Sequence, residues 1–310
     1  MRKFILKILL FLFLFPCSAF LFILLDVYVI KDQYLGNYQA SLIDKVERLK
    51  SIDEPQIVII GDSSVCFGFN SEMIEDAFGM PVVDMGLHGG LGNAFHEDMA
   101  KLNLTEGDII IICHTSYSDD DTIIDVNLAW ITLETHKELW EIVRKKDLPD
   151  LIIGYPYYLS NAIVLRCMNE PQNIASNNTC YSRSAFNEYG DIVRRFEDSY
   201  EFTAGSSRVP AISDTCINRL NVLNEYIEDH GVTMLVAGYP IAYGEYTPVP
   251  SEFEEFEEEL RDSLDCDVIS HFTDYFIPYD YFYDTQLHLD EDGAIIRTEQ
   301  LISDLNNWMN

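Results

Sequence analysis

Runs of apolar residues alternate with amphipathic segments from residue 56 onward. Gln56 to Ile60 is a continuous β-branched run that ends at Gly61, as expected of a parallel strand buried on both faces. The pattern predicts strands at 56–60, 81–83 and 109–113 and helices at about 70–79 and 93–103. Strands and helices that alternate in this way favour an α/β domain with a doubly wound sheet.

Residues 118–210 interrupt this alternation. A helix is expected at 130–143, an apolar stretch with Tyr and Pro covers 149–160, and 169–208 is rich in polar residues. We interpret this block as an insertion over one end of the sheet. Beyond it, the pattern predicts helices at about 212–229, 251–264 (with Ser251 as N-cap) and 290–308, and strands at 232–237 and 266–269. The predicted fold is a three-layer α/β/α sandwich with a mostly parallel sheet of about five strands.

The N-terminus carries a candidate membrane anchor within residues 1–30. Three basic residues precede an apolar run, Ile8–Leu25, whose 18 residues would rise about 27 Å as a helix. A cleaved signal peptide is the main alternative, although no small-x-small cleavage site follows the run, and a buried soluble helix is another. Basic residues before the span favour a single-pass membrane protein with its body outside the cytoplasm. Residues 31–54 would form a stalk or leading helix, and 55–310 the main domain.

Charge and cysteine content narrow the possible partners. The formal net charge is −32, and a surface this acidic repels phosphate backbones, so we expect no nucleic-acid partner. Seven cysteines in 310 residues do not make a disulfide framework, although Cys167 and Cys180 could close a loop disulfide outside the cytoplasm. The chain has no Cys-x-x-Cys or His-x-x-x-His spacing. We therefore expect neither a structural zinc site nor any other metal or cofactor.

Two segments carry candidate chemistry. Gly61-Asp62-Ser63-Ser64 follows the first strand, which places a serine at the carboxyl edge of the sheet, where α/β enzymes build their sites. By itself this is also the pattern of an ordinary capped turn. However, Asp284 and His288 lie in the loop that opens the last helix, and a serine hydroxyl needs a base, usually a histidine oriented by a carboxylate.

These segments resemble the SGNH (GDSL-like) hydrolase superfamily over roughly residues 56–310, apart from the insertion. The family's first block, Gly-Asp-Ser-x, matches 61–64 and makes Ser63 the nucleophile. Its second block, Asn-x-Gly-x-x-Gly, matches 84–89 with Asp84 in place of Asn. The resemblance implies that the amides of Ser63 and Gly89 form the oxyanion hole, with His288 as base and Asp284 as its partner.

Two departures from the family pattern stand out. The third block is usually Gly-x-Asn-Asp, and here the matching stretch is 114–117, with Ser116 at the position of the Asn that donates to the oxyanion. Ser116 is therefore a candidate third donor with a shorter reach. The last block is usually Asp-x-x-His, whereas Asp284 lies four residues before His288 and Thr285 occupies the usual place.

The resemblance implies an O-acetylesterase or O-acyltransferase that acts on a cell-envelope polysaccharide through an acyl-Ser63 intermediate. The expected partners are an acylated or acceptor cell-surface glycan and the lipid bilayer through the N-terminal helix, and a membrane-bound acyltransferase is a further candidate partner. The alternative is a non-catalytic envelope-binding or assembly protein that keeps the fold with an altered site.

Overall fold

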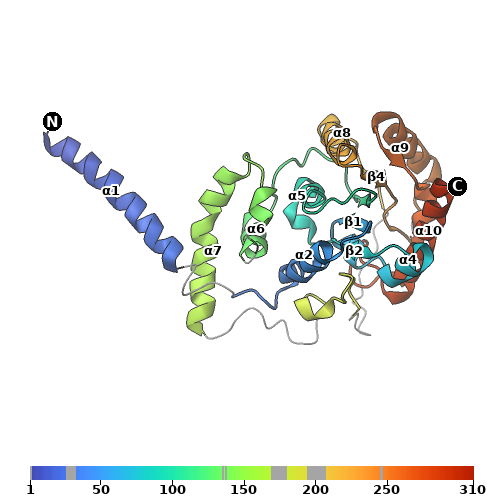
Figure 1. Ribbon diagram of the computed structural model, residues 1–310, viewed down its shortest axis with the longest axis horizontal. Coiled ribbons are helices and arrows are strands. Elements are labelled where there is room, and N and C mark those ends of the chain that lie inside the picture. Colours follow the sequence, from blue (N-terminus) through green and yellow to red (C-terminus); the bar gives the residue numbers. More distant parts are fainter. Residues whose placement is uncertain are drawn as a thin grey trace.

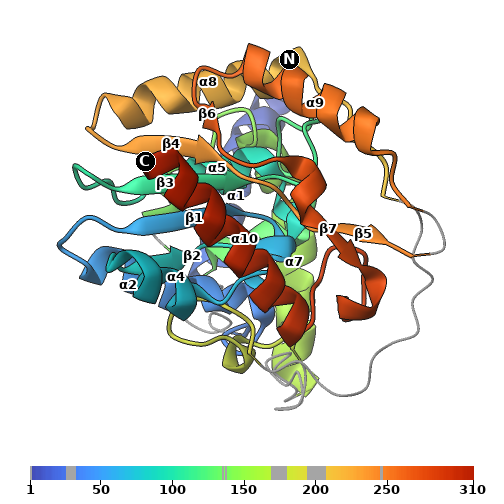
Figure 2. The ribbon, with the colours of Figure 1, turned by 90° about the vertical axis from the view of Figure 1, so that its right-hand side faces the viewer.

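A computed structural model describes residues 2–25, 33–134, 136, 138–168, 180–193, 207–244 and 247–310. Within these residues, five parallel strands form one sheet in the order β2-β1-β3-β4-β6, which lies inside the main body (Figure 1) and whose strands are labelled in Figure 2. The strands are β1 (Ile57–Gly61), β2 (Val82–Asp84), β3 (Ile109–Cys113), β4 (Thr233–Val236) and β6 (Asp267–Val268). The predicted α/β class and the mostly parallel sheet are confirmed.

Helices cover both faces of this sheet (Figure 2). Alternate residues of β1 enter separate cores: Val58 and Ile60 pack in one, and Ile57 and Ile59 in the other. The first core includes residues of α2 (Ser41–Ser51), α5 (Asn93–Met99), α8 (Asp214–Glu228) and α9 (Pro250–Ser263). The second includes residues of α4 (Ser71–Phe78) and α10 (Glu291–Met309). Both faces of the strands are therefore apolar, which explains their continuous hydrophobic runs.

The order of the strands determines where the chemistry lies. The chain passes from β1 to β2 on one side and then crosses to β3 on the other, so β1 and β3 flank the point where the order reverses. In open α/β sheets, sites form beside the carboxyl ends of the strands at such a point. The segments that follow β1 and β3 carry Ser63 and Ser116.

The insertion differs from the sequence prediction. The prediction of one helix at 130–143 is wrong. Helix α6 (Val126–Leu133) ends earlier, and a short 3-10 helix, η4 (Glu138–Glu141), follows it. The apolar stretch belongs to α7 (Leu148–Met168), which packs against α6 (Figure 1). The indole of Trp130 donates to the carbonyl of Leu151 at 2.8 Å, which joins the two helices. Cys167 and Cys180, both within the described residues, are free thiols, and the loop disulfide is not formed.

Smaller elements complete the domain. A second sheet of two parallel strands, which the sequence did not predict, pairs β5 (Ile241–Tyr243) with β7 (Phe276–Pro278). The short helices are α3 (Ser63–Cys66), η2 (Tyr38–Ala40), η3 (Gly89–Leu91), η5 (Arg183–Ala185), η6 (Phe272–Tyr275) and η7 (Tyr279–Tyr281). The N-cap of α9 is Val249 and not Ser251, because Pro250 begins the helix. Proline suits this first position, since its fixed φ is helical and its missing N–H has no partner there.

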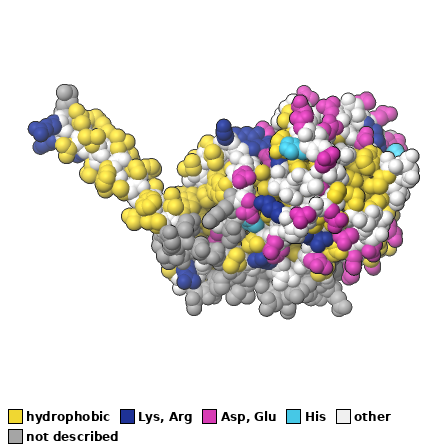
Figure 3. Space-filling model, in the orientation of Figure 1, with side chains coloured by type: hydrophobic (Ala, Val, Ile, Leu, Met, Phe, Trp, Pro, Cys, Tyr) yellow, Lys and Arg dark blue, Asp and Glu magenta, His cyan; other side chains and the backbone are white. Residues whose placement is uncertain are grey.

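Helix α1 (Arg2–Leu25) projects from the domain (Figure 1). Arg2–Leu24 has a mean hydropathy of 2.4 and is long and apolar enough to cross a membrane. Its hydrophobic side chains form an exposed surface (Figure 3), whereas acidic side chains gather on the main body.

Candidate active site

Ser63 lies at the junction of β1 and α3. The side chain of Asp62, the N-cap of α3, accepts the N–H of Ser64 at 2.8 Å, so the capping role suggested by the sequence belongs to Asp62. Gly61 is required by close packing, because a Cβ there would lie 2.7 Å from the carbonyl oxygen of Cys113 on β3. Ser64 is buried, whereas Ser63 is partly exposed. The turn therefore presents Ser63 at the carboxyl edge of the sheet.

The structure brings Ser63, His288 and Asp284 into one hydrogen-bonded chain. His288 Nε2 lies 2.8 Å from Ser63 Oγ, and its Nδ1 lies 2.7 Å from Asp284 Oδ1. With the ring proton on Nδ1, the imidazole donates to the carboxylate and accepts the hydroxyl proton of the serine. This is the arrangement in which a histidine acts as general base toward a serine nucleophile.

Thr285 holds together the turn that the extra residue between Asp284 and His288 creates. Its Oγ1 accepts the backbone N–H groups of Leu287 and His288, each at 3.2 Å. Thr285 therefore stabilises the loop, and the carboxylate that contacts the imidazole belongs to Asp284.

An aromatic residue fixes the plane of the imidazole. Phe67, the C-cap of α3, stacks on His288 with ring centroids 4.0 Å apart and an angle of 7° between the planes. His288 is buried against it. Because Phe67 follows Ser63 by one helical turn, a single segment presents Ser63 and supports the imidazole of His288.

Tyr181 is a residue of this site that the sequence analysis missed. Its hydroxyl donates a hydrogen bond to Asp284 Oδ2 and lies 3.3 Å from His288 Nδ1. Burial by itself raises the pKa of Asp284, but hydrogen bonds from His288 and Tyr181 together hold it below its usual value. Burial and the neighbouring Asp284 raise the pKa of Tyr181. No local signal in its Asn- and Ser-rich surroundings marks this tyrosine.

Gly89 lies beside the nucleophile turn, as its expected oxyanion role requires. A Cβ at Gly89 would stand 3.5 Å from the Cβ of Asp62. Among the described residues, no acceptor bonds the backbone N–H of Ser63 or of Gly89. His88 Nδ1 instead accepts the N–H of Gly90 at 2.9 Å, which shapes the η3 turn. Two backbone amides without an acceptor beside Ser63 are the kind of donors that an oxyanion hole requires.

A buried lysine contacts the turn at residues 84–89, the second block of the sequence pattern. Asp84 Oδ1 accepts the N–H of Gly86 at 2.7 Å and lies 3.3 Å from Lys45 Nζ. Lys45, from α2, also donates to the backbone carbonyls of Asp84, Gly86 and Gly190. Burial raises the pKa of Asp84 to about 7, although the Lys45 ammonium acts in the opposite direction. The family's Asn is thus replaced by an Asp that contacts a buried cation from the predicted leading helix.

The third block is arranged differently from the family pattern. The hydroxyl of Thr115 donates to Asp62 Oδ2 at 2.5 Å, and so contacts the nucleophile turn directly. The hydroxyl of Ser116 donates to Ser118 Oγ at 3.2 Å, while its carbonyl accepts from Asn93. No hydrogen bond among the described residues joins Ser116 to Ser63 or Gly89. Its role as a third oxyanion donor stays a prediction.

A buried arginine joins the nucleophile turn to α10. The guanidinium of Arg297 donates to the carbonyl of Ser64 at 2.6 Å and to that of Gly238 at 3.1 Å, and stacks 4.0 Å from the ring centre of Phe69. The same helix begins just after His288. Arg297 therefore links the segment that carries His288 to the segment that carries Ser63.

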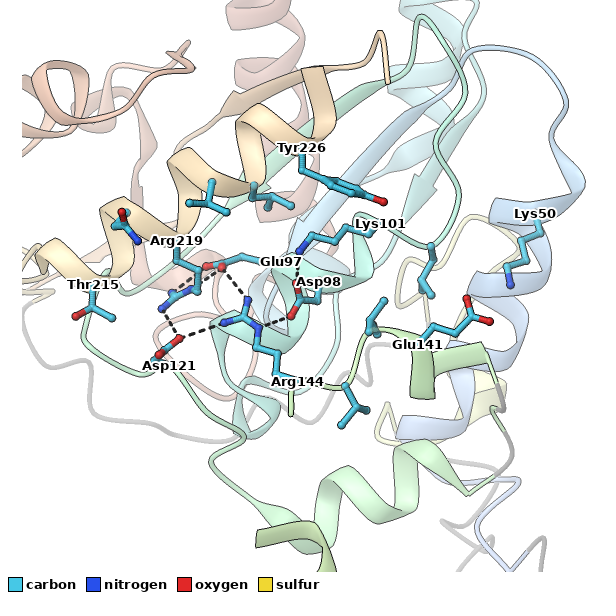
Figure 4. Close-up of a pocket in the computed structure, with 16 residues that line it drawn as sticks. Lys50, Glu97, Asp98, Lys101, Asp121, Glu141, Arg144, Thr215, Arg219 and Tyr226 are labelled. Atoms are coloured by element: carbon cyan, nitrogen blue, oxygen red, sulfur yellow. Dashed lines mark hydrogen bonds and ion pairs between the residues drawn. The ribbon is translucent and has the colours of Figure 1, made fainter. Parts of the chain in front are cut away.

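A polar pocket of about 830 Å³ lies elsewhere, against α5 and α8 (Figure 4). Both of its arginines already have carboxylate partners: Arg219 contacts Glu97, and Arg144 contacts both Asp98 and Asp121. None of the three residues of the hydrogen-bonded chain lines it. We therefore assign the candidate chemistry to the edge of the sheet at Ser63.

Comparison of the chain with protein-family models, with curated proteins and with solved structures finds no match in any of the three. The functional argument therefore rests on the geometry of the site.

Proposed function

We propose that this chain is a membrane-anchored serine acyl-transfer enzyme of the SGNH type that acts on a cell-envelope polysaccharide. The observation that carries the proposal is the chain of hydrogen bonds from Ser63 through His288 to Asp284, because these groups come from opposite ends of the domain. A buried imidazole held between a carboxylate and a serine hydroxyl is the arrangement that activates the serine.

In the proposed reaction, His288 Nε2 takes the proton of Ser63 while Ser63 Oγ attacks the acyl carbon of an ester. The carbonyl oxygen becomes an oxyanion, to which the N–H groups of Ser63 and Gly89 donate. His288 then returns the proton to the leaving alkoxide as the ester C–O bond breaks, which leaves an acyl-Ser63. Water or a sugar hydroxyl, deprotonated by His288, attacks this intermediate, so hydrolysis and transfer share one mechanism.

The proposed location follows from α1. Its basic start and apolar length support insertion with the N-terminus in the cytoplasm, and the domain would then lie outside. A tethered domain meets substrates of the envelope, and the SGNH resemblance supports an acylated or acceptor glycan as substrate. A membrane-bound acyltransferase would supply the acyl group where the reaction is transfer.

A serine-reactive fluorophosphonate tests the catalytic part of the proposal. We expect the full-length chain to be labelled, Ser63→Ala and His288→Ala to lose the label, and Ser64→Ala to keep it, since Ser64 is buried and makes no contact with His288. Folding of each variant is checked by thermal unfolding. A folded wild-type protein that takes no label would instead support the non-catalytic binding or assembly protein.

Fractionation of cells tests the anchor separately. We expect the full-length chain in the membrane fraction, resistant to alkaline carbonate and released by detergent. Recovery in the soluble fraction would overturn the anchor without bearing on the labelling of Ser63.

A further inference from the structure

The outer surface of α7 is unusually apolar for a protein this acidic. Five of its large side chains are between 53% and 76% exposed: Ile152, Ile153, Tyr157, Val164 and Met168, here called the α7 apolar row. Positions 153, 157, 164 and 168 are spaced by four and seven residues, which places them on one face of the helix. Apolar surfaces that are continuous in this way mark sites of interaction with a protein or a membrane.

The charge of α7 also sets it apart from the rest of the domain. The chain holds 52 acidic residues, yet none lies between Leu151 and Met168, where the one charged residue is Arg166. In contrast, α9 carries seven acidic residues in 14 positions. The charges just before this stretch balance, because Lys145 and Lys146 are followed by Asp147 and Asp150, and Lys146 pairs with Asp121. This face can therefore approach anionic lipid head groups, which the remainder of the domain would repel.

The α7 surface continues onto α1. Side chains of both helices line an apolar groove of about 700 Å³, with Phe15, Ser18, Ala19, Phe22 and Ile23 on α1 and Ile152, Tyr155, Pro156, Leu159, Ser160 and Ile163 on α7. Figure 3 shows hydrophobic side chains that extend from α1 onto the adjoining side of the body. Phe15 lies ten residues before Leu25, which is about 15 Å along a helix. The groove therefore lies beside the second half of α1.

The aromatic residues next to this groove suit the boundary of a membrane. Trp130 lines the groove, and its ring lies 4.7 Å from that of Tyr155 and 5.6 Å from that of Tyr158. The ring centre of Trp140 lies 5.5 Å from that of Trp130. Tryptophan and tyrosine concentrate at membrane–water interfaces because they combine an apolar ring with a polar group.

We propose that α7 lies in the membrane interface beside α1, with its apolar row in contact with the acyl chains. This inference rests on the membrane-spanning role proposed for α1. If α1 crosses the bilayer, its second half passes through the outer acyl region and head groups, and the groove holds α7 at that depth. An interfacial helix buries its apolar face by about 5–10 Å, which matches such a position. The domain would then have two attachments to the membrane and one fixed orientation.

Lipid quenching of a fluorophore in the full-length chain tests this placement. The reporter variant is Ile153→Cys in a Cys17→Ser/Cys167→Ser background, because the five remaining cysteines are buried. After labelling with bimane, it is reconstituted into phosphatidylcholine–phosphatidylglycerol vesicles with or without brominated acyl chains. The matched control is Val222→Cys on α8, an exposed apolar position away from α1 and α7. We expect the emission at position 153 to fall in brominated vesicles and that at position 222 to stay unchanged.

A third reporter separates this inference from the anchor. In Cys167→Ser, the exposed native Cys17 reports on α1 itself. Quenching at Cys17 without quenching at 153 would overturn the placement of α7 and leave the anchor intact. In that case, iodide in the aqueous phase measures whether position 153 is exposed to water. Protection from iodide without quenching by lipid would mean that a protein covers the α7 apolar row, which also contradicts lipid contact. Absence of quenching at Cys17 would refute the anchor and the inference together, while the labelling of Ser63 remains a separate result.

Discussion

The hydroxyl of Tyr181 donates a hydrogen bond to Asp284 Oδ2, across 103 residues of sequence. Tyr181 belongs to the insertion, and Asp284 to the loop before the last helix. The other carboxylate oxygen of Asp284 contacts His288. The insertion therefore contributes a side chain to the candidate site and helps to orient the carboxylate.

Tyr181→Phe tests this relationship. We expect the esterase rate to fall roughly 3- to 30-fold, because one charge-assisted hydrogen bond that orients Asp284 is lost. In an Asp284→Ala background the same change should have little further effect, since the two residues act through one contact. Tyr226→Phe on α8 is the control and should leave the rate unchanged. Additive losses in the double variant would mean that Tyr181 acts through another group.

The choice between Asp284 and Thr285 gives a second prediction. Asp284→Ala should lower the rate by roughly 10- to 100-fold, as expected when only the orienting carboxylate is removed. Thr285→Val removes the acceptor for two backbone N–H groups and should lower the melting temperature with a smaller loss of rate. Steady-state kinetics and thermal unfolding of both variants measure this. A larger loss of rate in Thr285→Val would show that this loop has been misassigned.

The buried pair of Asp84 and Lys45 predicts how stability depends on pH. The pKa of Asp84 is about 7 in the folded chain, above its unfolded value near 4, so the folded state binds the extra proton. This contribution is fully present below about pH 4 and is lost as pH rises through about 7. Asp84→Asn resembles the protonated form at every pH. Its stability relative to wild type should therefore rise between pH 5 and pH 8, by on the order of 2–4 kcal/mol.

Urea unfolding of the detergent-solubilised full-length chain across this pH range measures the difference. A wild type that gains stability over Asp84→Asn as pH rises would show that the ion pair outweighs the cost of burying the carboxylate.

Thr115 and Ser116, which are adjacent in the third block, are expected to respond differently to substitution. Thr115→Val keeps the shape of the side chain but removes its bond to Asp62, and should cost about 1–3 kcal/mol of stability. Ser116→Ala should change the rate by less than about tenfold, because its hydroxyl faces Ser118. Loss of a true oxyanion donor costs about 10²–10³ in rate. A loss of that size in Ser116→Ala would restore Ser116 as the third donor.

Features that depend on neighbours in the chain were determined by the sequence alone. The buried strands at 57–61 and 109–113 are continuous apolar runs, and the first ends at the turn that carries Ser63. The loop with Asp284 and His288 could be chosen because the last predicted helix follows it, and the structure joins both residues to Ser63 in one hydrogen-bonded chain. The apolar length of α1 is likewise a property of consecutive residues.

Which side chains form hydrogen bonds and ion pairs with the site residues was decided only by the tertiary structure. Tyr181 contacts Asp284, and Lys45 contacts Asp84, through side chains that no local pattern pairs. The packing of α7 against α6 and the exposure of the α7 apolar row likewise depend on which segments lie side by side in the fold. Hydrophobic periodicity reports which face of a segment is buried, but a hydrogen-bond partner is selected by how distant segments pack.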